Sequence, residues 1–133
     1  MKRRTMYASE NIIWTLLGEI LQDARYNGFE CRDQVLIRNL FNELNRLEDE
    51  ERRYVNNGAS VDFVIFHKLN KSPVLVIEVD GFAFHENSPK QLTRDRMKDH
   101  IFDTYGLPLL RLPTTGSGED QRIRMKLDEV MTK

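Results

Sequence analysis

The sequence predicts an α/β sandwich in which helices cover both faces of a central mixed β-sheet. Two compact runs, Val61–His67 (VDFVIFH) and Pro73–Val79 (PVLVIEV), are apolar on both faces, as expected of central strands with helices on either side. A segment of helical periodicity precedes them, and a capped helix, a short strand and a terminal helix follow. With 133 residues, 40% of them hydrophobic, the chain is expected to form a single domain over residues 1–133.

Before the two apolar runs, the sequence predicts one helix and one extended segment. From Tyr7 to about Arg25 the apolar residues recur at helical spacing, and Asn27-Gly28 ends that helix. Phe29 to Leu40 alternates loosely, which indicates a strand or an irregular extended piece. Residues 42–59 form a charged insertion, for which we expect a solvated helix or a mobile excursion.

The later elements are marked by turn and capping signals. The KLNKS stretch between the two apolar runs predicts a β-hairpin. Ser88 suits the N-cap and Pro89 the first position of a helix that runs to about Tyr105. A short strand is expected over 107–112 and a terminal helix over 119–131.

The predicted hairpin brings carboxylates together. If His67 and Pro73 close the turn, Asp62 lies directly opposite Glu78, and Asp80 points to the same face as Glu78. Like charges opposed across strands destabilise a sheet, so we expect a divalent cation with oxygen ligands to compensate them. Alternatively, Asp62 simply begins its strand and Asp80 is a turn residue. That alternative does not explain Glu78, which stands within the apolar stretch VLVIEV.

Other polar residues are candidates for the same site. Glu10 lies on the apolar stripe of the first helix, where it is either a further acid of the site or a partner of the helix dipole. Lys98 is either a surface partner of Asp95 or a cation beside the acids. His85 is either a structural or surface histidine or a candidate for proton transfer, because the ordinary pKa of histidine lies near neutrality. The basic residues that could contact a nucleic-acid backbone are Lys90, Arg94, Arg96, Lys98 and Arg111.

Composition narrows the class of protein. A net charge of −1 argues against a chain that binds DNA mainly through charge, although not against a local basic patch beside a metal ion. Cys31 is the only cysteine, so an internal disulfide is not possible. The apolar run near the N-terminus is broken by Thr15, Gly18 and Glu19, and no segment suits a signal peptide or membrane span. We therefore expect a cytoplasmic protein with no membrane association.

Together these pieces resemble the PD-(D/E)XK, or restriction-endonuclease-like, nuclease superfamily. The resemblance runs from Ala8 to Leu112 and comprises the Ser9-Glu10 helix start, VDFVIF, VLVIEVDGFAFH, QLTRDRMKDHIF and GLPLLRL. It is strongest for the branch that contains very-short-patch repair endonucleases and the small nuclease domains often fused to helicases. It implies a restriction-endonuclease-like α/β/α sandwich that hydrolyses DNA phosphodiester bonds. It also implies Mg²⁺ or Mn²⁺ held by Asp62 and Glu78, with Glu10 bound directly or through water.

The sequence departs from this family at one important position. Asp80 stands where the superfamily usually has a lysine, and it would bind metal or orient His85. His85 and Asp95 match the places of a histidine and a helix aspartate in the very-short-patch branch, whereas Lys98 could replace the lysine from the helix. The alternative is a catalytically inactive nuclease-like module that binds DNA or a partner protein. The expected partners are DNA, a second copy of the chain, or a covalently fused helicase or DNA-targeting domain.

Overall fold

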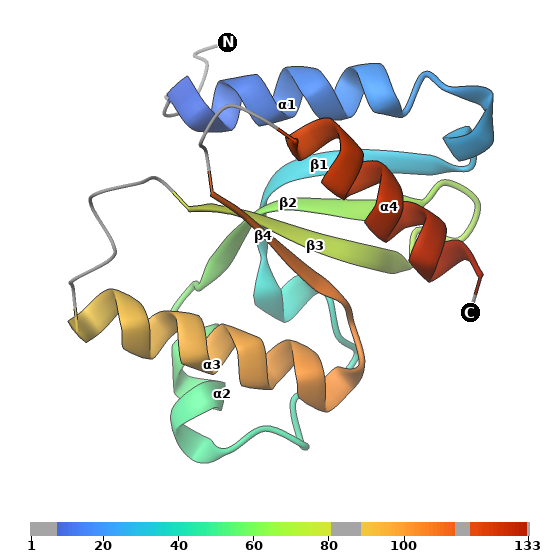
Figure 1. The fold of residues 1–133 in the computed structure, drawn as a ribbon. Helices are drawn as coiled ribbons and strands as arrows, with labels where there is room; N and C mark the ends of the chain where they lie inside the picture. The colour runs from blue at the N-terminus through green and yellow to red at the C-terminus, as the bar shows by residue number, and fades with distance from the viewer. Residues whose placement is uncertain (1–7, 81–88, 114–117, 133) are drawn as a thin grey trace, which may run out of the picture.

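The computed structural model describes residues 8–80, 89–113 and 118–132, and these form the expected α/β sandwich (Figure 1). Its helices and strands are, in chain order, α1 (Ala8–Ile20), β1 (Phe29–Leu36), α2 (Asp49–Asn56), β2 (Ser60–His67), β3 (Pro73–Asp80), α3 (Pro89–Tyr105), β4 (Leu109–Pro113) and α4 (Glu119–Met131). Short 3₁₀ turns follow α1 at Ala24–Tyr26 and β1 at Ile37–Asn39.

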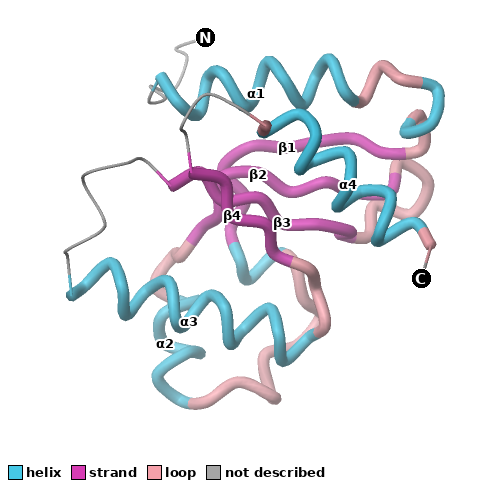
Figure 2. The backbone as a smooth tube through the Cα atoms, viewed as in Figure 1, coloured by secondary structure: helices cyan, strands magenta, loops and turns pink. Residues whose placement is uncertain are grey.

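The four strands form one mixed sheet in the order β1-β2-β3-β4. β2 is antiparallel to both of its neighbours, whereas β4 runs parallel to β3 after the crossover through α3. α1 and α4 cover one face of the sheet, and α2 and α3 cover the other (Figures 1 and 2). None of the helices in the described part of the chain is long and apolar enough to cross a membrane.

The apolar core is divided between the two faces of the sheet. Phe63 and Ile77 pack on the side of α1 and α4, whereas Val64 and Val76 pack on the side of α3. Successive residues of β2 and β3 therefore point to opposite faces and are buried on both. This burial explains why both strands read as continuous apolar runs.

The register of the β2–β3 hairpin is as predicted along the strands but not at the turn. Phe63 pairs with Ile77 and Ile65 pairs with Leu75. The same register, extended by one residue from Phe63, places Asp62 opposite Glu78. The expectation that His67 and Pro73 close the turn is wrong, because Pro73 pairs with Phe66. The register shifts between Ile65 and Phe66, as happens where a strand carries a β-bulge.

The charged insertion is a helix that packs against the sheet. Glu48 and Glu51 form a capping box at the start of α2, in which each side chain accepts a backbone N–H. Leu47 and Val55 are buried in the core beneath α3. Of the two expectations for residues 42–59, a helix is found, over Asp49–Asn56 only, but the expectation that it is solvated is wrong because buried side chains anchor it to the core.

Candidate active site

Two acidic side chains meet where β2 begins and β3 ends. The backbone N–H of Asp62 donates to Glu78 Oε2 at 3.0 Å, and the N–H of Val79 donates to Asp62 Oδ2 at 2.7 Å. Glu78 is only 6% exposed, and Asp62 is half-buried. The hairpin thus brings together the two carboxylates that the sequence placed opposite each other.

The environment of this pair disfavours two negative charges. Burial, and then the Glu78 carboxylate, raise the pKa of Asp62 to about 7, although the Val79 N–H acts in the opposite direction. The Glu10 carboxylate raises the pKa of Asp62 further. At neutral pH the Asp62 carboxyl is therefore partly protonated, and the pair does not carry two full negative charges.

α3 supplies a buried cation to the same pair. Lys98 Nζ donates a hydrogen bond to Glu78 Oε1, and the side chains of Lys98 and Glu78 are 12% and 8% exposed. Burial acts to lower the pKa of Lys98, but the Glu78 carboxylate outweighs it and raises the pKa above its ordinary value. Of the two interpretations of Lys98, the structure places it beside the acids. Asp95 instead accepts from Gln91 and Arg111.

α1 and β1 add a third acid and its partner. Gln34 Nε2 donates to Glu10 Oε1 at 3.3 Å, and both residues are half-buried. Because the Glu10 carboxylate raises the pKa of Asp62, the two side chains are within electrostatic reach of each other. The position of Glu10 on the apolar stripe of α1 thus brings it toward the acid pair.

Asp80 and Arg111 belong to a neighbouring ion cluster. Arg111 lies opposite Glu78 in the parallel β3–β4 register, and its guanidinium is 3.7 Å from Asp80, 3.3 Å from Asp95 and 2.9 Å from Asp99. The structure thus brings Asp80 to the arginine of β4, and three carboxylates surround the Arg111 side chain. Arg111 fastens α3, which carries Lys98, to the sheet.

The remaining sequence candidates are surface residues of α3 or lie outside the described residues. Lys90, Arg94 and Arg96 are exposed on α3. His85, and the expected cap at Ser88, lie outside the described residues.

Tyr54 of α2 is a site residue that the sequence reasoning missed. Burial raises its pKa, and the charges of Lys98, Glu78 and Arg94 act on its hydroxyl. One feature of the sequence could have pointed to it, because Tyr54 is the only aromatic residue within the charged segment 42–59. That segment contributes to the site as well as to the core.

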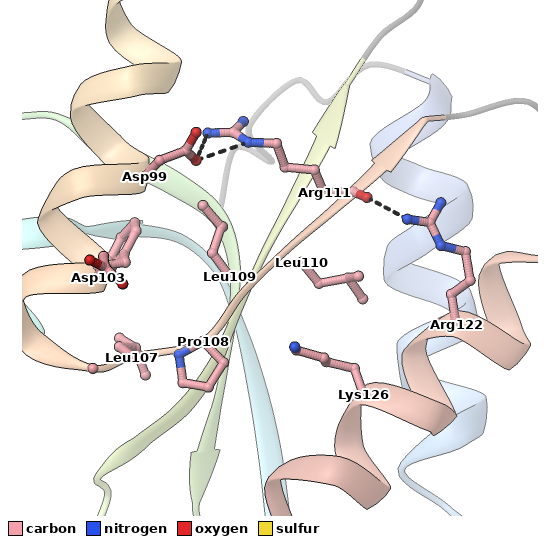
Figure 3. A pocket seen from close by; sticks show the side chains of 11 residues that line it. Asp99, Asp103, Leu107, Pro108, Leu109, Leu110, Arg111, Arg122 and Lys126 are labelled. Carbon is pink, nitrogen blue, oxygen red and sulfur yellow. Dashed lines mark hydrogen bonds and ion pairs between the residues drawn. The ribbon is translucent and has the colours of Figure 1, made fainter.

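A separate groove runs along β4 between α3 and α4 (Figure 3). Its volume is about 680 Å³, and its lining includes Leu109, Leu110 and Lys126. Arg122 spans part of this groove by donating to the backbone carbonyl of Arg111 at 3.1 Å. The groove contains neither Asp62 nor Glu78, so it is distinct from the acid pair.

The donor set at the acid pair suits a hard divalent cation. Asp62 and Glu78 supply carboxylate oxygens, and Lys98 neutralises only one of the two charges. Within the described ranges, no cluster of three or more His, Cys, Asp or Glu side chains is arranged to hold a metal. Mg²⁺ commonly binds through one or two carboxylates while it keeps several waters and contacts substrate phosphates. Two carboxylates with Glu10 nearby fit that mode of binding.

The fold and site define the chain as an α/β sandwich domain with a buried carboxylate pair held by a lysine. The chain belongs to the family described as "Protein of unknown function (DUF2726)", which matches residues 2–131. Comparisons with curated proteins and with solved structures gave no match.

Proposed function

We propose that this protein is a metal-dependent endonuclease that hydrolyses DNA phosphodiester bonds. Asp62 and Glu78 would hold Mg²⁺, and Lys98 would replace the lysine that the PD-(D/E)XK resemblance leads one to expect at Asp80. The observation that carries the proposal is the contact of the buried Lys98 ammonium with Glu78, beside the Asp62 carboxylate. An ammonium and two carboxylates are the three charged groups that the resemblance requires.

The position of Lys98 on α3, next to Glu78, supports an active nuclease over a catalytically inactive nuclease-like module. The loss of the lysine at position 80 is the main reason to expect an inactive module. Lys98 supplies the same charge to the same carboxylate from the following helix, and Arg111 holds that helix against the sheet. Burial of two acids with repelling charges is also unfavourable unless a cation binds there.

Each residue of the site has a distinct part in the proposed chemistry. When bound, Mg²⁺ would lower the pKa of a water molecule and stabilise negative charge on the phosphate. Asp62 would hold the ion through its carboxylate form, and because burial and Glu78 raise its pKa to about 7, that form becomes more abundant as the pH rises past 7. Lys98 orients the Glu78 carboxylate and places positive charge where charge develops on the phosphate. In this proposal His85 assists proton transfer.

The surface beside the site offers a modest number of contacts to DNA. Lys90, Arg94 and Arg96 are exposed on α3, where they could contact phosphate groups. With a net charge of −1, the chain is expected to bind DNA weakly and to lose affinity as salt increases.

The test is cleavage of DNA by the purified protein with Mg²⁺ or Mn²⁺. Single-stranded, double-stranded and mismatched DNA should be compared, and we expect metal-dependent nicking or cutting that Asp62→Ala abolishes. Glu50→Ala is the matched control, since it removes an exposed acid of α2 outside the site. The proposal is wrong if calorimetry detects no metal binding and the wild type matches Asp62→Ala on every DNA. DNA binding without turnover would instead support the inactive module.

A further inference from the structure

Gln34 adopts a backbone conformation that glutamine seldom adopts. Its φ angle is 50°, in the left-handed region, although it lies within β1. Long side chains are uncommon there, and such strained residues occur often at functional sites. Among the described non-glycine residues, Lys71 also has a positive φ, of 61°, but it lies in the β2–β3 hairpin loop. A loop commonly accommodates such a residue, whereas a strand interior does not.

The position of Gln34 in the sheet connects it to the acid pair. Asp33 pairs with Phe63 and Val35 pairs with Val61, so Gln34 falls opposite Asp62 in the β1–β2 register. This is the point at which the ladder between Phe29 and Leu36 is interrupted. The irregular residue of β1 thus lies beside the acid that begins β2.

The left-handed backbone changes where the Gln34 side chain goes. In a regular antiparallel pair, residues directly opposite each other share a face, and Val64, two residues beyond Asp62, packs on the α3 side. α1 covers the other face of the sheet (Figure 1). The positive φ of Gln34 interrupts the regular alternation of side chains between the two faces of the sheet. The Gln34 side-chain amide Nε2 donates to Glu10 Oε1 of α1 at 3.3 Å.

We infer that Gln34 is a positioning residue, which holds the Glu10 carboxylate beside the Asp62–Glu78 pair. Gln34 lies opposite Asp62 in the β1–β2 register, and its amide donates to the Glu10 carboxylate, so Glu10 is held toward the start of β2. The consequence for metal binding, which rests on the proposed function, is that Gln34 increases the affinity of the site for a divalent cation. It does so through Glu10, without contact to the ion.

Two substitutions separate positioning from a merely structural role. Gln34→Gly removes the amide and relaxes the backbone, because glycine adopts a positive φ without strain. Gln34→Asn keeps an amide and tolerates the left-handed region, but it is one methylene too short to reach Glu10. We expect both variants to lower the affinity for Mn²⁺ by about tenfold in calorimetry, while neither lowers the urea midpoint. Lys71→Gly is the control, since it relaxes the same kind of strain away from the site and should bind Mn²⁺ like the wild type.

A metal-free measurement makes the inference independent of the proposed function. In EDTA, the urea midpoints of Gln34→Asn, Glu10→Gln and the double variant form a double-mutant cycle. Non-additive effects support the positioning of Glu10 by Gln34, whereas additive effects overturn it, whether or not the wild type binds metal. If the wild type binds Mn²⁺ and both Gln34 variants bind it equally well, the inference is also overturned and the proposed function stands. If the wild type binds no Mn²⁺, the proposed function fails and the cycle alone decides the role of Gln34.

Discussion

Replacement of Asp62 by asparagine should make the protein more stable at alkaline pH. Burial and the Glu78 carboxylate raise the pKa of Asp62 to about 7 from 3.8, so the folded protein binds a proton there more tightly than the unfolded chain. The contribution of Asp62 to stability is therefore full at acidic pH. It is lost as the pH rises from about 4 through about 7. Asparagine does not ionise and removes this loss.

The size of the effect follows from the shift. About three pH units correspond to roughly 4 kcal/mol at 1.4 kcal/mol per unit. Asp62 is only half-buried and the site can relax when it ionises, so we expect about 2 kcal/mol. The hydrogen bond from the Val79 N–H should survive, because the asparagine side chain keeps a carbonyl oxygen. Its amide group can also donate to Glu78.

The assay is urea unfolding in EDTA at several pH values between 4.5 and 8.5. The wild type should lose about 2 kcal/mol across this range relative to Asp62→Asn, and the two proteins should have similar stability at pH 4.5. Glu50→Gln, an exposed neutralisation, should follow the wild-type curve. Parallel curves for the wild type and Asp62→Asn would refute the reasoning. Under the proposed function, the same variant would also lose metal binding, so activity and stability would change in opposite directions.

Two further predictions concern the other buried acids. Lys98→Met leaves the Glu78 carboxylate buried without its cation and should lower the free energy of unfolding in urea at pH 8 by about 3 kcal/mol. Adding Glu78→Gln to this variant should reduce the loss. An unchanged urea midpoint for Lys98→Met would contradict this prediction. The hydrogen bond to the buried Glu51 raises the pKa of His100, so this pair should stabilise the fold fully below about pH 6.5 and lose its effect as the pH rises through the raised pKa. His100→Asn should therefore lower the urea midpoint at pH 6 and change it less at pH 9, and an equal effect at both pH values would argue against the pair.

The sequence predicted the sheet well because its central strands are buried on both faces. An apolar run such as VLVIEV is typical of a strand buried on both faces. A single charged residue within such a run, here Glu78, is expected to have a partner that compensates its charge. The hairpin register was predictable as far as Ile65, but the shift beside Phe66 was not. A bulge depends on how the whole sheet twists and packs, and no residue in FVIFH indicates it.

The parts of the site that the sequence did not reveal depend on tertiary contacts. Helical spacing placed Lys98 on a face with Asp95, but only the packing of α3 decided that its ammonium meets Glu78. Asp80 was expected to bind the metal or to orient His85, and its contact with Arg111 depends on the parallel pairing of β3 with β4. The conformation of Gln34 was not predicted, because the loose alternation over Phe29 to Leu40 indicated that the segment could be irregular but not at which residue.

The residues of the acid site come from six separate elements, namely α1, β1, α2, β2, β3 and α3. A chain still emerging from the ribosome has no such site until α3 has docked onto the sheet, since Glu78 then gains its lysine. A ligand that binds only the assembled site would shift the folding equilibrium toward the native state. Under the proposed function, activity would therefore require molecules in which α3 has docked onto the sheet.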